Sequence, residues 1–160
     1  MWWVMAGAAV AQTPTEVGSV RPFGLGVQLG TFSGITGKLY LRGRETAFDF
    51  AVGTAYGATF ADSVHAHVTF HQHFGPLTEG AGVTIPWRLG VGGWLNAGRY
   101  WVVPQFEGRG VIAGARLPVG LDFDLEDVPV QFYAEIAFAL VIVPGITAGL
   151  DGSIGVRYYF

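Results

Sequence analysis

The sequence predicts an all-β fold, an eight-stranded antiparallel up-and-down barrel that crosses a membrane. Apolar residues alternate with polar or small ones in eight segments, which is the two-residue period of a strand. Charged residues make up 13% of the 160-residue chain and apolar residues 51%, so a small soluble domain would lack a charged surface. No apolar stretch reaches the length of about 18 residues that a membrane helix needs. A membrane protein without spanning helices must be a closed barrel.

The first four expected strands each set bulky apolar residues against small or polar ones. In the first expected strand the small or polar positions are mostly glycine. In the second strand these positions carry lysine, tyrosine and arginine. In the third strand phenylalanine and valine alternate with aspartate, alanine and glycine, and in the fourth valine and phenylalanine alternate with four histidines. Phe32–Gly34 is expected to be a tight turn, and Gly43–Thr46 is typical of a hairpin. The four ranges are Phe23–Thr31, Ile35–Arg42, Ala47–Tyr56 and Val64–Phe74.

The last four expected strands repeat this pattern. The fifth and sixth set tryptophan, leucine and valine against arginine, aspartate and glycine, and Leu125–Pro129 turns the chain before the seventh. The eighth keeps its alternation to the last residue of the sequence. Strands of about 9–11 residues can cross a bilayer at a tilt, and an even number brings both ends to one side. The ranges are Ile85–Trp94, Val111–Phe123, Val130–Ile142 and Gly149–Phe160.

The composition of the two parities predicts which face of the sheet points outward. A lipocalin-like soluble barrel also alternates, with its apolar side chains inside. Here the polar parity is mostly glycine and alanine with single charges, which suits a narrow lumen, whereas the bulky parity would overfill eight strands. We therefore expect the apolar parity to face lipid. Aromatic girdles at the two membrane interfaces are expected from Trp87, Phe123, Tyr158 and Phe160.

The inward parity carries equal numbers of cations and anions. Unpaired charges in a narrow interior would cost several kcal/mol each, so the balance predicts a lumen plugged by ion pairs rather than a channel of one sign. Asp122 and Asp124 lie near a turn, so we expect them in a wet mouth of the barrel. The expected cations are Lys38, Arg42, Arg88, Arg116 and Arg157, and the anions are Asp49, Asp122, Asp124, Glu135 and Asp151.

The N-terminal residues resemble the remnant of a secretion signal. Trp2–Ala11 is apolar, and Ala9-Val10-Ala11 fits an A-x-A cleavage pattern, although a basic start is missing. We expect residues 1–11 to be the signal remnant, 12–21 a flexible periplasmic lead-in, and 22–160 the barrel domain. Both ends of the barrel domain would then lie in the periplasm.

A row of histidines is the cluster best suited to carry chemistry. His65, His67, His71 and His73 share one parity, and an H-x-H pair on a strand can chelate zinc or copper. Four in a row cannot all reach one ion without a bend, so a polar lumen stripe is the alternative. A catalytic alternative, a lipid-modifying or proteolytic barrel, rests on Ser63 and His65 beside Asp62.

A surface-interaction site is a further hypothesis. Leu95–Gly110 is the longest expected outer loop, and Arg99, Tyr100 and Trp101 in it belong to the residue types that anchor interfaces. The other expected outer loops are Phe32–Gly34, Gly57–Ser63 and Val143–Ala148. The net charge of −3 argues against a nucleic-acid partner, and the absence of cysteine excludes disulfides and thiolate metal sites. No cofactor is expected.

The terminal alternation of Ile154, Val156, Tyr158 and Phe160 resembles the C-terminal signal that the bacterial barrel-assembly machinery recognises. With it, nearly the whole expected mature chain resembles the small OmpA/OmpX-like barrels of Gram-negative bacteria. Arg116–Leu121, Phe132–Ala137 and Gly155–Phe160 are also similar to a family of uncharacterised outer-membrane barrels that ends in RYYF. The resemblance implies a location in the outer membrane, with lipid and the assembly machinery as partners, and we expect a monomer. The plugged, charge-paired lumen predicts a structural or surface-interaction role; a narrow passive pore for small solutes is the alternative.

Overall fold

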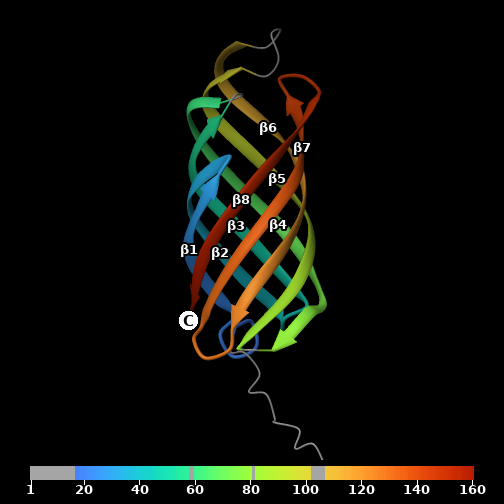
Figure 1. The fold of residues 1–160 in the computed structure, drawn as a ribbon. Helices are drawn as coiled ribbons and strands as arrows, with labels where there is room; N and C mark the ends of the chain where they lie inside the picture. Colours follow the sequence, from blue (N-terminus) through green and yellow to red (C-terminus); the bar gives the residue numbers. More distant parts are fainter. Residues whose placement is uncertain (1–16, 58–59, 81, 102–106) are drawn as a thin grey trace, which may run out of the picture.

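The computed structural model is a closed antiparallel β-barrel (Figure 1). It describes residues 17–57, 60–80, 82–101 and 107–160, without the side chains of 42, 56–57, 60–62, 79, 99–101 and 107–109. Within these ranges each strand pairs with its neighbours in sequence, and β8 pairs with β1 to close the sheet. The predicted all-β, eight-stranded antiparallel barrel is therefore confirmed. The strands are β1 (Phe23–Gly30), β2 (Phe32–Arg42), β3 (Thr46–Gly57), β4 (Phe60–Gly80), β5 (Val83–Trp101), β6 (Glu107–Leu125), β7 (Val130–Val143) and β8 (Thr147–Tyr159).

Three strands are much longer than the sequence pattern predicts. β4 has 21 residues, and β5 and β6 have 19 each. The expected loop Leu95–Gly110 is mostly strand, because the β5–β6 pairing continues to Trp101 opposite Glu107. Glycine and polar residues interrupt the apolar alternation there, but ladder hydrogen bonds to a neighbouring strand do not depend on apolar side chains. The expected outer loop 57–63 likewise gives way to strand from Phe60 onward.

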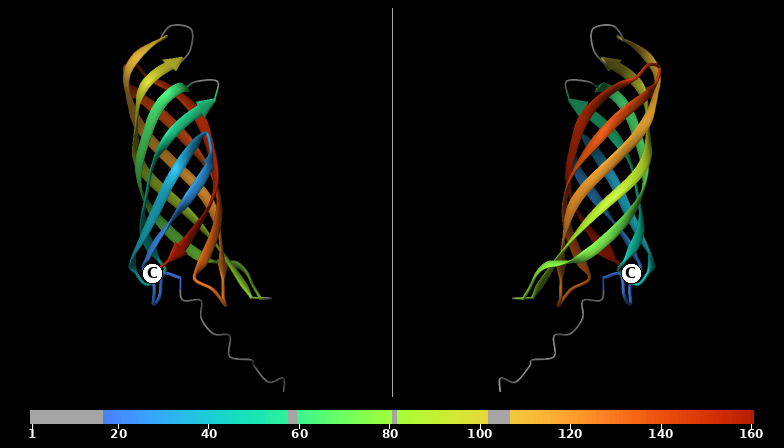
Figure 2. Two further views of the ribbon diagram at one scale, coloured as in Figure 1. Left: turned by 90° about the vertical axis from the view of Figure 1, so that its left-hand side faces the viewer. Right: turned by 90° about the vertical axis from the view of Figure 1, so that its right-hand side faces the viewer.

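The β1–β2 connection also differs from the prediction. The expected turn at Phe32–Gly34 is the beginning of β2, and only Thr31 separates the two strands. Phe32 has the same parity as Thr36 and Lys38, and its side chain is only 5% exposed. It therefore belongs to the inward face of the strand. This hairpin is short, and Figure 2 shows β4, β5 and β6 rising well beyond its tip.

The two ends of the barrel differ. We call the end where β1 begins and β8 finishes the terminal end, and the opposite end the distal end. At the terminal end the β4–β5 hairpin flares outward, away from the barrel axis (Figure 2). The pairing of its two strands shifts register between His73 and Pro76 and again between Pro76 and Thr78, and such bulges bend a ribbon.

Residues 17–21, expected to be part of a flexible lead-in, form a turn. The Gly18 N–H donates to the Arg21 carbonyl at 2.9 Å, and Val17 is fully buried. The expected signal remnant 1–11 and residues 12–16 lie outside the described residues. In the part of the chain that the structure describes, no helix is long and apolar enough to cross a bilayer.

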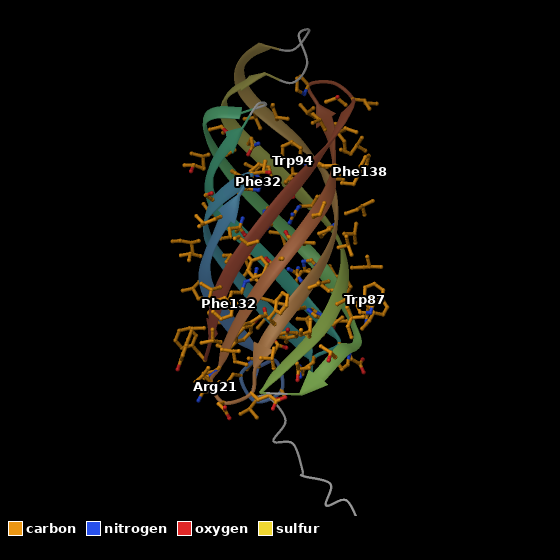
Figure 3. The ribbon with its side chains drawn as sticks, viewed as in Figure 1. Arg21, Phe32, Trp87, Trp94, Phe132 and Phe138 are labelled. Carbon is orange, nitrogen blue, oxygen red and sulfur yellow. The ribbon has the colours of Figure 1, made fainter. Side chains whose placement is uncertain are left out.

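Side-chain parity runs as predicted along the strands. Bulky apolar residues point outward, with Leu150 75% exposed and Ile154 61% exposed. Charged residues of the opposite parity are buried, and Lys38, Arg88 and Asp122 have no exposed area. A lipocalin-like barrel would show the reverse arrangement. Figure 3 shows this division, with Trp87 and Phe138 projecting from the wall.

Candidate functional site

The lumen is the candidate site, and Arg88 on β5 lies at its centre. Its Nε donates to Asp122 Oδ1 at 3.0 Å, and its Nη1 lies 3.0 Å from Glu135 Oε2. The same Nη1 is 2.9 Å from His71 Nε2. Lys38 approaches Asp122 from the other side of the barrel, at 2.5 Å. These contacts connect β2, β4, β5, β6 and β7 across the barrel interior.

Two further arginines extend this network. Arg157 Nη2 donates to Asp49 Oδ2 at 2.6 Å and to Thr36 Oγ1 at 2.6 Å. Arg116 Nη2 lies 2.7 Å from Glu135 Oε1 and 3.1 Å from Asp151 Oδ1. Burial of an ion is tolerated only when a counter-ion and hydrogen bonds replace its water. The network therefore ties strands together around an interior filled by side chains. We define the lumen network as Lys38, Arg88, Arg116 and Arg157 with Asp49, Asp122, Glu135 and Asp151.

Glycines on the inward parity make room for these long side chains. A Cβ on Gly90 would lie 2.6 Å from His71 Nδ1, and a Cβ on Gly155 would lie 2.5 Å from the Tyr133 ring. The Arg157 guanidinium stacks over that same ring, 4.0 Å from its centre. A larger residue at either glycine would displace part of the lumen packing.

Asp122 and Asp124 do not lie in a wet mouth, as the sequence pattern suggested. Both side chains are fully buried, because the two residues are two positions apart on β6 and both face the lumen. Asp124 forms an ion pair with Arg44. This residue of the β2–β3 turn was not among the cations expected in the lumen. Asp124 also accepts a hydrogen bond from Gln131 at 2.6 Å. The side chain of Arg42 lies outside the described residues.

Apolar clusters lie above and below the lumen network. The distal cap contains Phe32, Ala55, Trp94, Ile112 and Val141, each at most 6% exposed. The terminal cap contains Val17, Tyr40, Ala47 and Tyr159, each at most 4% exposed. In the terminal cap the two tyrosine hydroxyls both bond to Gln131, at 3.2 and 2.8 Å. The ion pairs are thus enclosed from both ends.

The sequence analysis did not predict the caps, although the alternation of residues along the strands indicates most of their members. Phe32, Trp94 and Ile112 occupy inward positions of their strands, so the alternation places them in the lumen. They are both large and apolar, whereas the other large side chains on this face are mostly charged or polar. Val17 precedes the first strand, and no periodic pattern places it.

The four histidines lie on one inward face, but each makes its own contacts. His65 Nδ1 bonds to Asn96 Oδ1 at 2.7 Å, and His65 Nε2 to His67 Nδ1 at 2.9 Å. His71 Nε2 lies 2.9 Å from Arg88 Nη1, and His73 Nε2 lies 3.2 Å from Asp122 Oδ2. Among the described residues, no group of three or more histidine, cysteine and acidic side chains is placed to hold a metal ion. The row forms a polar stripe in the lumen, the alternative that the sequence left open.

Ser63 and His65 do not form a catalytic pair in this structure. Ser63 Oγ is buried and makes no hydrogen bond within the described part of the chain. Both ring nitrogens of His65 are occupied by Asn96 and His67. A nucleophile needs its base within hydrogen-bond reach. The side chains of Asp62, Arg99, Tyr100 and Trp101 lie outside the described residues.

The C-terminal residues lie on the outer wall at the terminal end. Ile154, Tyr158 and Phe160 are 61%, 46% and 62% exposed, and Val156 shares their parity. The Phe160 N–H donates to the Phe23 carbonyl at 2.9 Å, and the two rings stack with centres 6.4 Å apart. Tyr158 packs edge-on against Phe160. The side chains form an aromatic patch at the β1–β8 seam.

Together these features define an eight-stranded barrel of the outer-membrane type, with bulky apolar side chains outside and ion pairs inside. A solved structure with this fold is the N-terminal β-barrel domain of Pseudomonas aeruginosa OprF. The match has a TM-score of 0.54 and 14% sequence identity, and covers 86% of this chain and 95% of that domain. At this identity the likeness concerns the fold. No family model matches the chain, and no curated protein matches it, so the narrower resemblance to the RYYF family has no support here.

Proposed function

We propose that this protein is a bacterial outer-membrane barrel with a closed, charge-paired lumen, a monomer whose role is structural or surface interaction. One observation carries the proposal: bulky apolar side chains cover the outer wall while eight charged side chains of the lumen network are buried inside. Only a lipid environment makes that distribution favourable, because exposed apolar surface is costly in water. The fold shared with the OprF barrel domain supports the same location.

The closed lumen supports a structural role over passive solute passage. A conducting pore of one sign would leave charges of that sign facing water along its length. Here each cation of the lumen network contacts an acid, and the distal and terminal caps cover the network. A solute would have to break several buried ion pairs to pass.

Conductance measurements test the closed lumen. The purified barrel, reconstituted in a planar bilayer, is expected to show no sustained single-channel steps. Insertion is checked in parallel by protection of the barrel from added protease in vesicles. Sustained steps from inserted protein would contradict closure and favour the narrow pore. Recovery of the protein as a stable monomer in buffer without detergent would overturn the membrane location itself.

The C-terminal aromatic residue gives a prediction about biogenesis. We expect Phe160→Ala to lower the yield of folded barrel in the outer membrane of a bacterial host, because we propose that the Tyr158–Phe160 patch is read by the assembly machinery. Refolding of purified protein into detergent, which needs no machinery, should change little. Phe138→Ala is the control, since Phe138 is a comparably exposed outward residue away from the terminal end (Figure 3). Equal yields of the two variants in cells would contradict the assembly signal.

A further inference from the structure

An apolar groove of about 700 Å³ lies on the outer wall of the barrel, away from the lumen. Residues of β1, β4, β5, β6, β7 and β8 line it, and the side chains that reach it from outward positions are apolar. Cavities of about 300–1,000 Å³ with mainly apolar linings are the usual size of small-molecule sites. The lumen network does not explain this groove, because it faces the opposite side of the sheet. The residues used below are Leu77, Trp87, Ala134, Gly152 and Ile154.

The floor of the groove is formed where small residues interrupt rows of large ones. Ala134 is paired between Leu121 and Ile154 on the adjacent strands. One step along, Gly152 is paired with Ile136. A Cβ on Gly152 would have nothing closer than a backbone oxygen at 3.7 Å. The backbone there does not require glycine, so the missing side chain leaves space on the outer face.

The flared β4–β5 hairpin provides the second wall. Trp87 stacks on Phe74 with ring centres 4.2 Å apart and planes 15° from parallel. Leu77 is 65% exposed and lines the groove from the same hairpin. The hairpin leans outward at the terminal end (Figure 2), and its Leu77 and Trp87 line the groove together with residues of β6–β8, so the groove is a concave corner between the hairpin and the wall. Figure 3 shows Trp87 projecting outward at the base of this hairpin.

We propose that this corner binds one hydrocarbon chain of a phospholipid. The proposal rests on the membrane location proposed above, because the groove is continuous with the apolar outer wall. Its lining offers hydrocarbon contact and almost no polar partner, so the recognised part of the ligand must itself be apolar. The wall of a second copy is convex and would leave much of a concave corner unfilled. A slender, flexible chain can fill it.

Two glycine substitutions provide a matched test. Gly152→Leu places a side chain in the groove, and Gly93→Leu places the same side chain elsewhere on the outer wall. A Cβ at either position meets only a backbone oxygen at 3.7 Å, so neither substitution forces its Cβ against the backbone. The proteins are extracted from vesicles of phosphatidylethanolamine and phosphatidylglycerol in mild detergent, and native mass spectrometry counts retained phospholipid. We expect one retained phospholipid for the wild type and Gly93→Leu, and little or none for Gly152→Leu.

Fluorescence of Trp87 gives a second readout. The other tryptophans are replaced by phenylalanine, and the protein is inserted in vesicles containing phospholipid with brominated acyl chains, which quench tryptophan on contact. We expect Gly152→Leu to weaken the quenching and Gly93→Leu to leave it unchanged. Equal lipid retention and equal quenching in both variants would overturn the chain-binding proposal while the membrane location stands. A dimer mass lost in Gly152→Leu would assign the groove to a second copy and also overturn it. Failure of all forms to enter vesicles would refute the membrane location instead.

Discussion

Arg88→Met is expected to destabilise the barrel by about 3–5 kcal/mol, the usual cost of removing one partner from a buried ion pair. Arg88 has no exposed side-chain area and neutralises Asp122 and Glu135 in the same lumen. Methionine fills part of the volume but leaves both carboxylates with one cation fewer, in a site that water reaches poorly. Reversible urea unfolding in detergent micelles, followed by tryptophan fluorescence, measures the change in the free energy of unfolding.

Arg44→Met is the control for that measurement. Arg44 also forms an ion pair with a buried acid, Asp124, but 31% of its side chain is exposed. Water reaches the Arg44 guanidinium, and the buried Asp124 keeps its hydrogen bond from Gln131 when Arg44 is replaced. We therefore expect a much smaller loss. Equal losses from the two substitutions would show that the lumen network is no more important to stability than a pair at the rim.

Gly26→Ala is expected to cost about 1–3 kcal/mol, in the range for overpacking, by disturbing the seam that closes the barrel. Gly26 on β1 is paired with Arg157 on β8, and its Cβ would overlap the Val156 carbonyl oxygen. That oxygen belongs to the backbone of the partner strand, so no side chain can rotate away. The seam must open locally to admit the methyl group. The same urea titration measures the loss, and it should be accompanied by faster amide exchange in β1 and β8.

Gly93→Ala is the matched substitution away from the seam. It adds the same methyl group to a strand glycine, and a Cβ added at this position would have an ordinary contact at 3.7 Å. Alanine in place of an unconstrained strand glycine should be neutral or slightly stabilising. A loss for Gly93→Ala as large as that for Gly26→Ala would mean that the general removal of glycine, rather than the close approach at the seam, sets the cost.

Sequence parity predicts most of this fold because a strand has only two faces. It separates the outward Leu150 and Ile154 from the inward Asp151 and Arg157 without reference to any partner. It also places all four histidines on one face. The strand ends are less predictable, since β5 and β6 continue by backbone pairing through residues that carry no apolar alternation.

Parity does not predict which lumen residues meet. Lys38 and Asp122 are 84 residues apart and lie on opposite walls, so their contact depends on the register of every intervening strand. Each bulge along the way, such as those near Pro76, shifts that register. The outer groove could not be predicted from the sequence for a related reason. Its floor comes from one alanine and one glycine on adjacent strands, and only the three-dimensional arrangement shows that they are neighbours.

In the proposed membrane location, the short β1–β2 hairpin has a consequence for the surrounding bilayer. β1 ends at Gly30 opposite Ser153, so β8 continues to Thr147 beyond its neighbour. Backbone groups in hydrocarbon must be paired within the protein, which sets the upper limit of immersion on this flank near Thr31. The eight residues of β1 span roughly 26 Å along the strand, and about 20 Å along the axis at a tilt of about 40°. The usual apolar band is about 25 Å tall. In that location the bilayer beside β1 would have to become thinner, whereas the bilayer beside β5 would not, and the barrel would impose an uneven thickness on the membrane.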